Sequence, residues 1–523
     1  MPNLESLPME DIGPSHTKES EAEYHELSND SIGDAEEGVA EGGNPELLPR
    51  TQPRWLEGRF DWLWCLLPFF LTAALGKSRR KQAKVTSTTY MNGIRGLACV
   101  VVFSAHVTGH YYKAFGNPWG AYPPELNHGI LQLPVLRTML AGKSMVCVFF
   151  VLSGFILSYS PLRTIVSAAK SPESTNDLTV KLCSGLLRRG IRLFLPMVVL
   201  AAITCVLTWY YPSFNPGGWR EFSPTFPIHM WNFYQITITV MNPYYWEVYI
   251  PMSFDHCWTL GTEYRGSLVI FMLCLAVSEL STRMRKLLFI ASAIWAMYWG
   301  RWDMSCFIEG MFLAELRYCP LSEDFEYLIP RSRRATMPTD GLQACPTSDD
   351  LHPSRGRRQI KTALASVLLL FSVLVLGWPA SGHQQIEPFN TINKLTPLMY
   401  RVTNDTTVCF WGSIGGFLFL VACENLPWIQ WLLSTPPVLY LGDISFSFYL
   451  LHWLTYLWPG VEMMNFFYYK LQWSKDSSFY LMYFVVFILI IISSDYYWRL
   501  VDEPSVKLGR FLFEKIRARK DKG

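Results

Sequence analysis

The chain has 523 residues, of which half are hydrophobic and only 17% are charged. A soluble domain usually carries about 25% charged residues, and a soluble chain of this length would form several domains joined by polar linkers. Here apolar blocks recur along most of the sequence, which favours one helical bundle in a lipid bilayer. The formal net charge of +2 is too small to indicate a nucleic-acid partner.

The residues at the two ends of the chain differ from the apolar middle. Residues 1–55 are acidic and hold few large apolar side chains, so they cannot offset the entropy cost of ordering, and we predict a disordered cytosolic tail. Residues 56–84 are predicted to form an interfacial helix and a basic linker, because the apolar stretch 61–76 has basic residues on both sides. A membrane span is the alternative for that stretch. The membrane domain is predicted to cover 85–512, and a basic cytosolic tail to cover 513–523.

A spanning helix needs about 20 mostly apolar residues. The segments that approach this length are 91–112, 145–161, 192–211, 257–278, 287–300, 302–317, 361–380, 408–423, 437–458 and 479–498. We therefore predict an all-α fold, a multi-pass transmembrane helical bundle of about ten spans with an additional N-terminal interfacial helix.

Lys and Arg concentrate in alternate loops, which predicts the orientation of the bundle. The basic loops are 162–191, 279–286 and 318–360. The loops between them are rich in Trp, Tyr, Pro and Asn, and they are 113–144, 212–256, 381–407 and 459–478. The assignment that puts every basic loop on the cytosolic side also puts both termini there. The plasma membrane and a membrane of the secretory pathway both fit this arrangement.

Ionisable residues inside a span are costly and therefore mark candidate sites. Arg95 and His106 are eleven residues apart, which is about 20° beyond three helical turns and about 16 Å along the axis, so both face the same side. The alternative for this pair is a packing histidine and an arginine that extends to the interface.

Two further stretches carry polar side chains in apolar surroundings. Trp258 and Glu263 stand at the outer end of the fourth predicted span, where the carboxylate would orient an imidazole or bind an acceptor hydroxyl. Ser445, Tyr449 and His452 follow i, i+4, i+7 spacing and so share one helix face. The alternatives are an interfacial tryptophan beside a hydrated carboxylate, and hydrogen bonds that only hold helices together.

Arg189 and Arg192 lie one turn apart at the predicted cytosolic mouth of the third span. Guanidinium groups match the geometry of phosphates, so this pair is a candidate site for the phosphates of a cytosolic cofactor. An ordinary cluster of inward-facing positive charge is the alternative.

The chain is similar in these segments to the acyltransferase-3 family of membrane acyltransferases. NGIRGLA at 92–98 resembles the family's D-G-L-R-G-L-A, and His106 falls at its R-x10-H spacing. The other resemblances are VFFVLSGFI at 148–156 to F-F-V-L-S-G-F, RGIRLFLP at 189–196 to R-x-x-R-L-x-x-P, WTLGTE at 258–263 to W-[ST]-L-x-x-E, LGDISFSFYLLH at 441–452 to L-G-x-I-S-Y-S-L-Y-L-L-H and, loosely, Glu503-Pro504 to a closing E-x-P. The motifs occur in family order, and the long loops resemble elaborations of fungal members.

One position departs from the family pattern. Asn92 stands where the family usually has Asp. Asparagine cannot act as a carboxylate, so any role that depends on that charge is in question here.

The resemblance implies an enzyme, an acyltransferase that transfers groups other than amino-acyl groups, with O-acetyl transfer expected. An acyl group, commonly acetyl, would move from a CoA thioester to a hydroxyl of a carbohydrate, lipid or small molecule. Acyl-CoA is the expected donor substrate and no tightly bound cofactor is expected. A non-catalytic transporter or acceptor-binding protein on the same bundle is the alternative, and the acceptor and the oligomeric state stay open.

The resemblance also implies roles for individual residues. His106 would be the general base that takes the proton of the acceptor hydroxyl, with an acyl-histidine intermediate as the variant. Arg95 and Glu263 would complete the catalytic set. The remaining candidates for binding the donor or the acceptor are Asn92, Ser153, Arg189, Arg192, Trp258, Ser445, Tyr449 and His452.

Overall fold

The structure, a computed structural model, describes residues 86–168, 175–211, 223–245, 254–320 and 355–520 together with Pro68. The predicted acidic tail and interfacial helix therefore lie outside the described residues, apart from Pro68. The described part of the chain is all-helical, in agreement with the predicted fold class. The predicted basic tail begins inside a helix, because α21 continues to Lys520.

The longer helices of the bundle are α5 (Thr89–Tyr111), α6 (Gly142–Ala168), α7 (Thr175–Tyr210), α9 (Trp258–Ala276), α10 (Thr282–Tyr298), α11 (Trp302–Tyr318), α13 (Arg355–Leu376), α15 (Asn404–Glu424), α20 (Lys475–Tyr497) and α21 (Glu503–Lys520). The shorter ones are α8 (Phe226–Met241), α14 (Phe389–Asn393), α16 (Pro427–Leu433), α17 (Pro436–Asp443), α18 (Ser445–Thr455) and α19 (Glu462–Asn465). π-helical turns cover Tyr456–Val461, Phe466–Lys470 and Trp498–Asp502.

Each of the ten predicted spans coincides with helix, but not all of these helices are long and apolar enough to cross a membrane. In the described residues, six stretches are long and apolar enough to cross one by length and composition: Thr89–Tyr111, Gly142–Ser167, Leu178–Tyr210, Gln359–Leu376, Asn404–Glu424 and Lys475–Arg517. The other predicted spans correspond to α9, to α10 and α11 with 17 residues each, and to the broken pair α17–α18. The count of ten stays a prediction.

Two predicted loops contain helix instead. The basic loop 162–191 is largely taken up by the end of α6 and the first turns of α7. The aromatic loop 212–256 holds α8, which starts with a proline in its first turn and buries Phe233, Ile236 and Val240 in a cluster with residues of α7 and α9. Polar and aromatic composition concealed these helices, because one buried face is enough to stabilise a helix against its neighbours.

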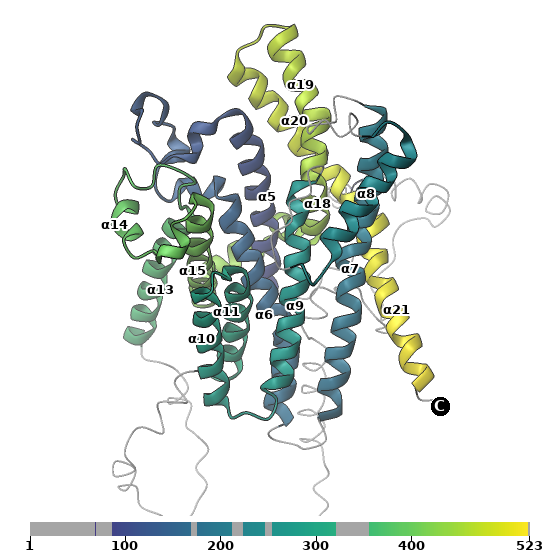
Figure 1. Cartoon of the computed structure of the whole chain (residues 1–523). Helices are drawn as coiled ribbons and strands as arrows, with labels where there is room; N and C mark the ends of the chain where they lie inside the picture. Colours follow the sequence, from purple (N-terminus) through teal and green to yellow (C-terminus); the bar gives the residue numbers. More distant parts are fainter. Residues whose placement is uncertain are drawn as a thin grey trace, which may run out of the picture. The chain divides into compact units, whose positions relative to one another are not determined.

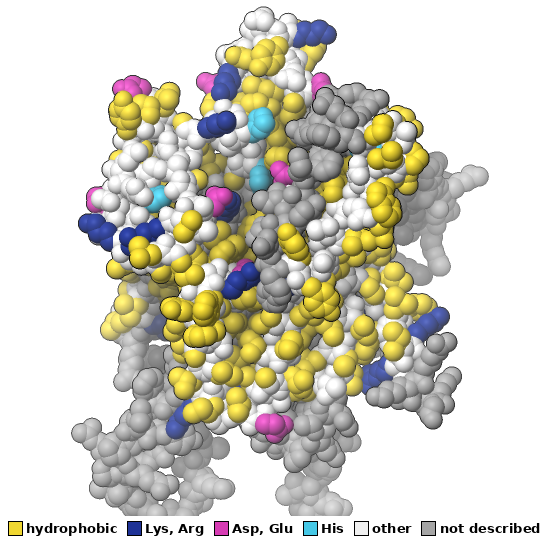
Figure 2. Space-filling model, viewed as in Figure 1, with side chains coloured by type: hydrophobic (Ala, Val, Ile, Leu, Met, Phe, Trp, Pro, Cys, Tyr) yellow, Lys and Arg dark blue, Asp and Glu magenta, His cyan; other side chains and the backbone are white. Residues whose placement is uncertain are grey.

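Three of the loops that were predicted to share a side lie in the upper half of the bundle. In Figure 1 the segment between α5 and α6, the α14 segment and the α19 segment lie in that half, while the turn between α9 and α10 lies at the bottom. Hydrophobic side chains dominate the face shown in Figure 2. Large apolar side chains on the helices are exposed, among them Met272 at 71% and Leu364 at 67%, as expected of helices that face lipid.

Glycines bring the central helices into backbone contact. A Cβ atom added at Gly154 of α6 would lie 2.0 Å from the carbonyl oxygen of Phe307 in α11, and one at Gly310 would lie 2.0 Å from that of Val151. On α5, a Cβ at Gly96 would lie 2.5 Å from the backbone nitrogen of Gly442 in α17. Small residues permit such close crossings in membrane bundles, and these crossings set the positions of the helices that carry the candidate site.

Candidate active site

Three histidine rings from separate parts of the chain lie together, and we call them the imidazole group: His106 of α5, His256 of the short turn Asp255–Cys257, and His452 of α18. The ring centroids of His106 and His452 are 5.3 Å apart, and those of His256 and His452 are 4.6 Å apart. His452 therefore occupies the middle of a row of imidazoles. In the described residues, no three His, Cys, Asp or Glu side chains are arranged to hold a metal ion.

Two members of the imidazole group have their tautomers set by backbone carbonyls. Nδ1 of His452 lies 2.6 Å from the carbonyl oxygen of Tyr449, and Nε2 of His256 lies 3.0 Å from that of Leu450. A carbonyl can only accept, so each of these nitrogens donates and the opposite ring nitrogen carries the lone pair. His452 Nε2 and His256 Nδ1 have no hydrogen-bond partner among the described residues, and the two side chains are 1% and 4% exposed. Both atoms can thus accept a hydrogen bond.

Tyr449 links the imidazole group to the charged part of the site. Its hydroxyl donates to the carbonyl oxygen of His256 at 2.7 Å and accepts from Thr259 Oγ1 at 2.7 Å. Glu263 is among its charged neighbours. The hydroxyl of Tyr449 thereby fixes the turn that carries His256.

The charged part of the site, which we call the arginine network, begins with an ion pair between α7 and α9. Arg189 Nη2 lies 2.6 Å from Glu263 Oε1, and Arg189 Nε donates to Ser267 Oγ at 3.0 Å. Ser153 of α6 donates to the same Glu263 oxygen at 3.0 Å. The pair is largely buried, with Arg189 7% and Glu263 21% exposed. Three predicted site residues thus meet, with Glu263 bound to an arginine.

Arg95, Arg192 and Asp502 complete the arginine network. Asp502 has Arg192 and Arg95 as electrostatic neighbours of opposite charge, and Arg95 is also a neighbour of Arg189. Arg189 and Arg192 lie near the middle of the 36-residue helix α7, which begins at Thr175. The predicted basic entry thus takes part in a network of three arginines and two carboxylates, and its place at a cytosolic mouth stays a prediction.

Asn92 and Ser445 lie at helix contacts beside these groups. Asn92 donates to Asp443 Oδ1 of α17 at 3.0 Å. The carbonyl of Ser445 accepts from the thiol of Cys99 at 3.1 Å, which joins α18 to α5. The side chain of Ser445 is buried, with 1% exposure.

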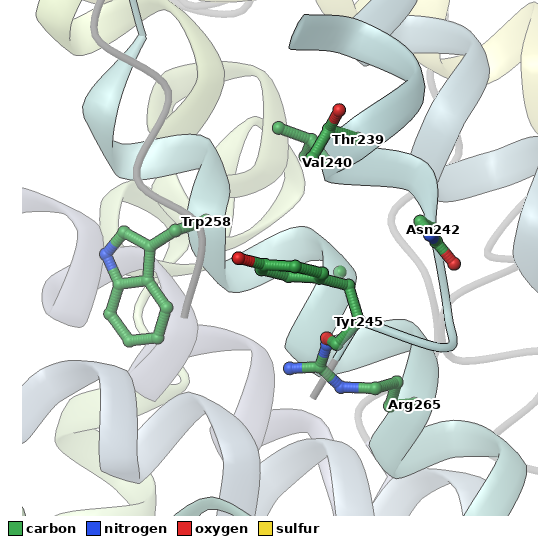
Figure 3. A pocket seen from close by; sticks show the side chains of 7 residues that line it. Thr239, Val240, Asn242, Tyr245, Trp258 and Arg265 are labelled. Carbon is green, nitrogen blue, oxygen red and sulfur yellow. The ribbon is translucent and has the colours of Figure 1, made fainter. Parts of the chain in front are cut away.

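Trp258 lines a small niche between α8 and α9 (Figure 3). The niche has a volume of about 10 Å³, room for roughly one water molecule, and its lining includes Asn242, Tyr245 and Arg265. The guanidinium of Arg265 donates to the carbonyl of Tyr245 and to Thr262 Oγ1. Trp258 thus borders the site on the side of α8, and the niche is too small for a substrate.

Two residues of the site were missed at the level of sequence. His256 stands two positions before Trp258, and a histidine so close to a recognised motif was the available signal. Asp502 directly precedes the Glu503-Pro504 element that was matched to the closing motif. Asp502 is the acidic residue that reaches the arginine network, since it is 5% exposed, whereas Glu503 pairs with Lys507 at 2.8 Å on the outside of α21.

Comparison with known proteins places the chain in a family. The model of the acyltransferase-3 family, described as an acyltransferase domain, matches residues 88–499. The O-acetyltransferase PaAT-1 of Phomopsis amygdali is 24% identical over 484 residues, which cover 85% of this chain and 88% of the relative.

Two further fungal relatives match the chain with similar identity and coverage. The acyltransferase clz18 of Cochliobolus lunatus is 21% identical over 83% of this chain and 97% of its own, and the acyltransferase R4 of a Phoma species is 20% identical over 83% and 98%. No solved structure matches the chain. The family match extends over most of the chain and includes all but one of the site residues described above, so the protein belongs to the acyltransferase-3 family and is an acyltransferase.

Proposed function

We propose that the protein is a membrane-embedded O-acyltransferase that moves an acyl group, acetyl foremost, from a CoA thioester to a hydroxyl of a carbohydrate, lipid or small molecule. The observation that carries the proposal is the imidazole group with the arginine network beside it in one bundle. The first supplies atoms that accept protons, and the second supplies positive charge for an anionic donor. The printed name of the Phomopsis relative, an O-acetyltransferase, supports the choice of acetyl.

In this proposal the donor enters from the cytosolic end, where CoA thioesters are made, so that the basic loops face the cytosol. Its phosphates bind at the arginine network, where Arg95, Arg189 and Arg192 carry three positive charges against the two carboxylates of Glu263 and Asp502. Guanidinium groups bind phosphate oxygens in pairs, which orients as well as attracts the donor. Glu263 and Ser153 hold Arg189 in position for that contact.

The acyl transfer itself takes place at the imidazole group. A ring nitrogen of His106 takes the proton of the acceptor hydroxyl as its oxygen attacks the thioester carbonyl carbon. When the tetrahedral intermediate collapses, the carbon–sulfur bond breaks and the imidazolium returns the proton to the thiolate, so an ester and free CoA leave. His452, whose ring lies 5.3 Å from that of His106, keeps a lone pair on Nε2 and stabilises the charged His106 through its dipole.

The test uses the purified protein with radiolabelled acetyl-CoA. The wild type is expected to hydrolyse the thioester slowly or to transfer the label, and His106→Ala is expected to lose the activity while it still inserts into the membrane. His110→Ala, one helical turn further along α5, is the matched control and is expected to stay active. Full activity of His106→Ala would refute the assigned base. Acceptor binding without any label transfer would favour the non-catalytic alternative.

The acceptor is best sought by mass profiling of metabolites and glycans from cells with and without the gene. A species that gains one acyl increment only when the gene is present identifies the acceptor. Transfer to that compound by the purified protein then connects the profile to the imidazole group.

A further inference from the structure

The carboxylate of Asp502 has an unusual setting. It ends the π-helical turn Trp498–Asp502 between α20 and α21, and such turns occur frequently at functional sites because the extra residue re-aims a side chain. The side chain is 5% exposed, and its Oδ1 atom has no hydrogen-bond partner among the described residues. A buried carboxylate oxygen without a donor is costly and calls for an explanation.

The charges around Asp502 supply that explanation. Its electrostatic neighbours are Arg192 and Arg95 with opposite charge and Glu503 with like charge. Arg192 is also repelled by Arg510 of α21, and Arg95 and Arg189 repel one another. Guanidinium groups held together in a low-dielectric bundle need nearby negative charge. Glu263 bonds directly to Arg189 and is also a neighbour of Arg192, while Asp502 is the strongest opposite charge for Arg192 and has Arg95 as a further neighbour.

We propose that Asp502 is a positioning residue that stands in for a phosphate group of the acyl donor. Its carboxylate balances Arg95 and Arg192 while the donor is absent and gives way to a donor phosphate on binding. The inference rests on the proposed function, because it takes a phosphate-bearing donor as the ligand. The ligand chemistry is a phosphate ester or diphosphate. Asp502 therefore sets how tightly the donor and the released CoA are held.

Asp502→Asn should strengthen CoA binding, whereas a substitution that only disturbs the fold would weaken it. Asp502→Asn removes a competing charge at nearly constant shape, so CoA should bind roughly five- to tenfold more tightly, the change expected for one partly screened charge in a protein interior. KM for acetyl-CoA should fall, and kcat should fall with it because CoA leaves slowly. Asp502→Glu keeps the carboxylate and should bind CoA much as the wild type does.

The experiment measures CoA binding by calorimetry to the full chain in nanodiscs of neutral phosphatidylcholine. Glu503→Gln is the matched control, since it removes an adjacent charge that is held in a partly exposed pair with Lys507, and it should change CoA affinity much less than Asp502→Asn does. A purely structural role for Asp502 predicts a lower thermal midpoint for Asp502→Asn with equal or weaker CoA binding, and that result overturns the proposal.

Two further arms separate the remaining explanations. Nanodiscs that contain phosphatidic acid test whether a lipid phosphate takes this place, and tighter retention of that lipid by Asp502→Asn without a gain for CoA overturns the assignment to the donor. If the wild type fails to bind CoA at all, the proposed donor site itself is wrong. If the wild type binds CoA and Asp502→Asn binds it no more tightly, only the role of Asp502 is wrong.

Discussion

The side-chain amide of Asn92 donates to the carboxylate of Asp443 at 3.0 Å, across a contact in which α5 and α17 nearly touch. A Cβ atom added at Gly442 would lie 2.7 Å from Asn92 Cγ, so the backbone of α17 packs directly against Asn92. The family pattern that this segment resembles has aspartate at the position of Asn92. The negative charge at this contact is thus carried by the partner helix.

This pairing predicts that Asn92→Asp is harmful although it restores the usual family residue. Two carboxylates about 3 Å apart repel one another, so stability should fall by about 1–3 kcal/mol. The double variant Asn92→Asp with Asp443→Asn exchanges the two groups and should recover most of the loss. Thermal unfolding in detergent measures both effects, and an Asn92→Asp protein as stable as the wild type would contradict the pairing.

The glycine contact on α5 permits a matched comparison within one helix. Gly96→Ala places a methyl group 2.5 Å from the backbone nitrogen of Gly442 and should destabilise the protein by about 1–3 kcal/mol, because backbone cannot yield as a flexible side chain does. Gly109→Ala meets nothing within 4 Å and should be neutral or stabilising by up to about 1 kcal/mol. Equal thermal midpoints for the two variants would show that the α5–α17 contact is looser than described.

His256 should be required for turnover. His256→Ala removes one end of the imidazole row and the ring that donates to the carbonyl of Leu450, so we expect acetyl transfer to fall by about 10²-fold or more. Rates on labelled acetyl-CoA test this, with CoA binding as the second readout. Affinity should stay near that of the wild type, because His256 lies in the imidazole group and not in the arginine network. A loss of CoA affinity that matched the loss of rate would indicate a folding defect instead.

Variants of the Arg189–Glu263 pair can separate an effect on stability from an effect on donor binding. Glu263→Gln removes the negative charge that balances the buried guanidinium of Arg189 and should cost about 2–4 kcal/mol of stability. The double variant Arg189→Gln with Glu263→Gln removes both charges and should regain stability while CoA binding stays weak. Calorimetry and thermal unfolding of the wild type, the single variant and the double variant measure the two effects. Strong CoA binding by the double variant would show that Arg189 is not part of the donor site.

Much of the helical framework follows from local sequence. Long apolar runs require a low-dielectric environment and internally satisfied backbone groups, so α5, α6, α13, α15 and α20 were predicted near their observed positions. Ser445, Tyr449 and His452 lie on one continuous helix, α18, as their spacing predicted. The first turns of α7 and the whole of α8 were predicted as loops, since their polar residues find partners only in the folded bundle.

The membrane bundle, the order of the family motifs and the candidates His106, Arg189, Glu263 and His452 were determined by the sequence alone. Their partners were decided by tertiary structure. Arg189 and Glu263 are 74 residues apart, and the carbonyl that accepts from His256 is 194 residues away, so no local periodicity brings them together. Helix packing makes those pairs, and it brings the predicted basic pair and Asp502 into one network of charged side chains. Which side chains meet depends on the whole set of helix crossings, and that information is not local.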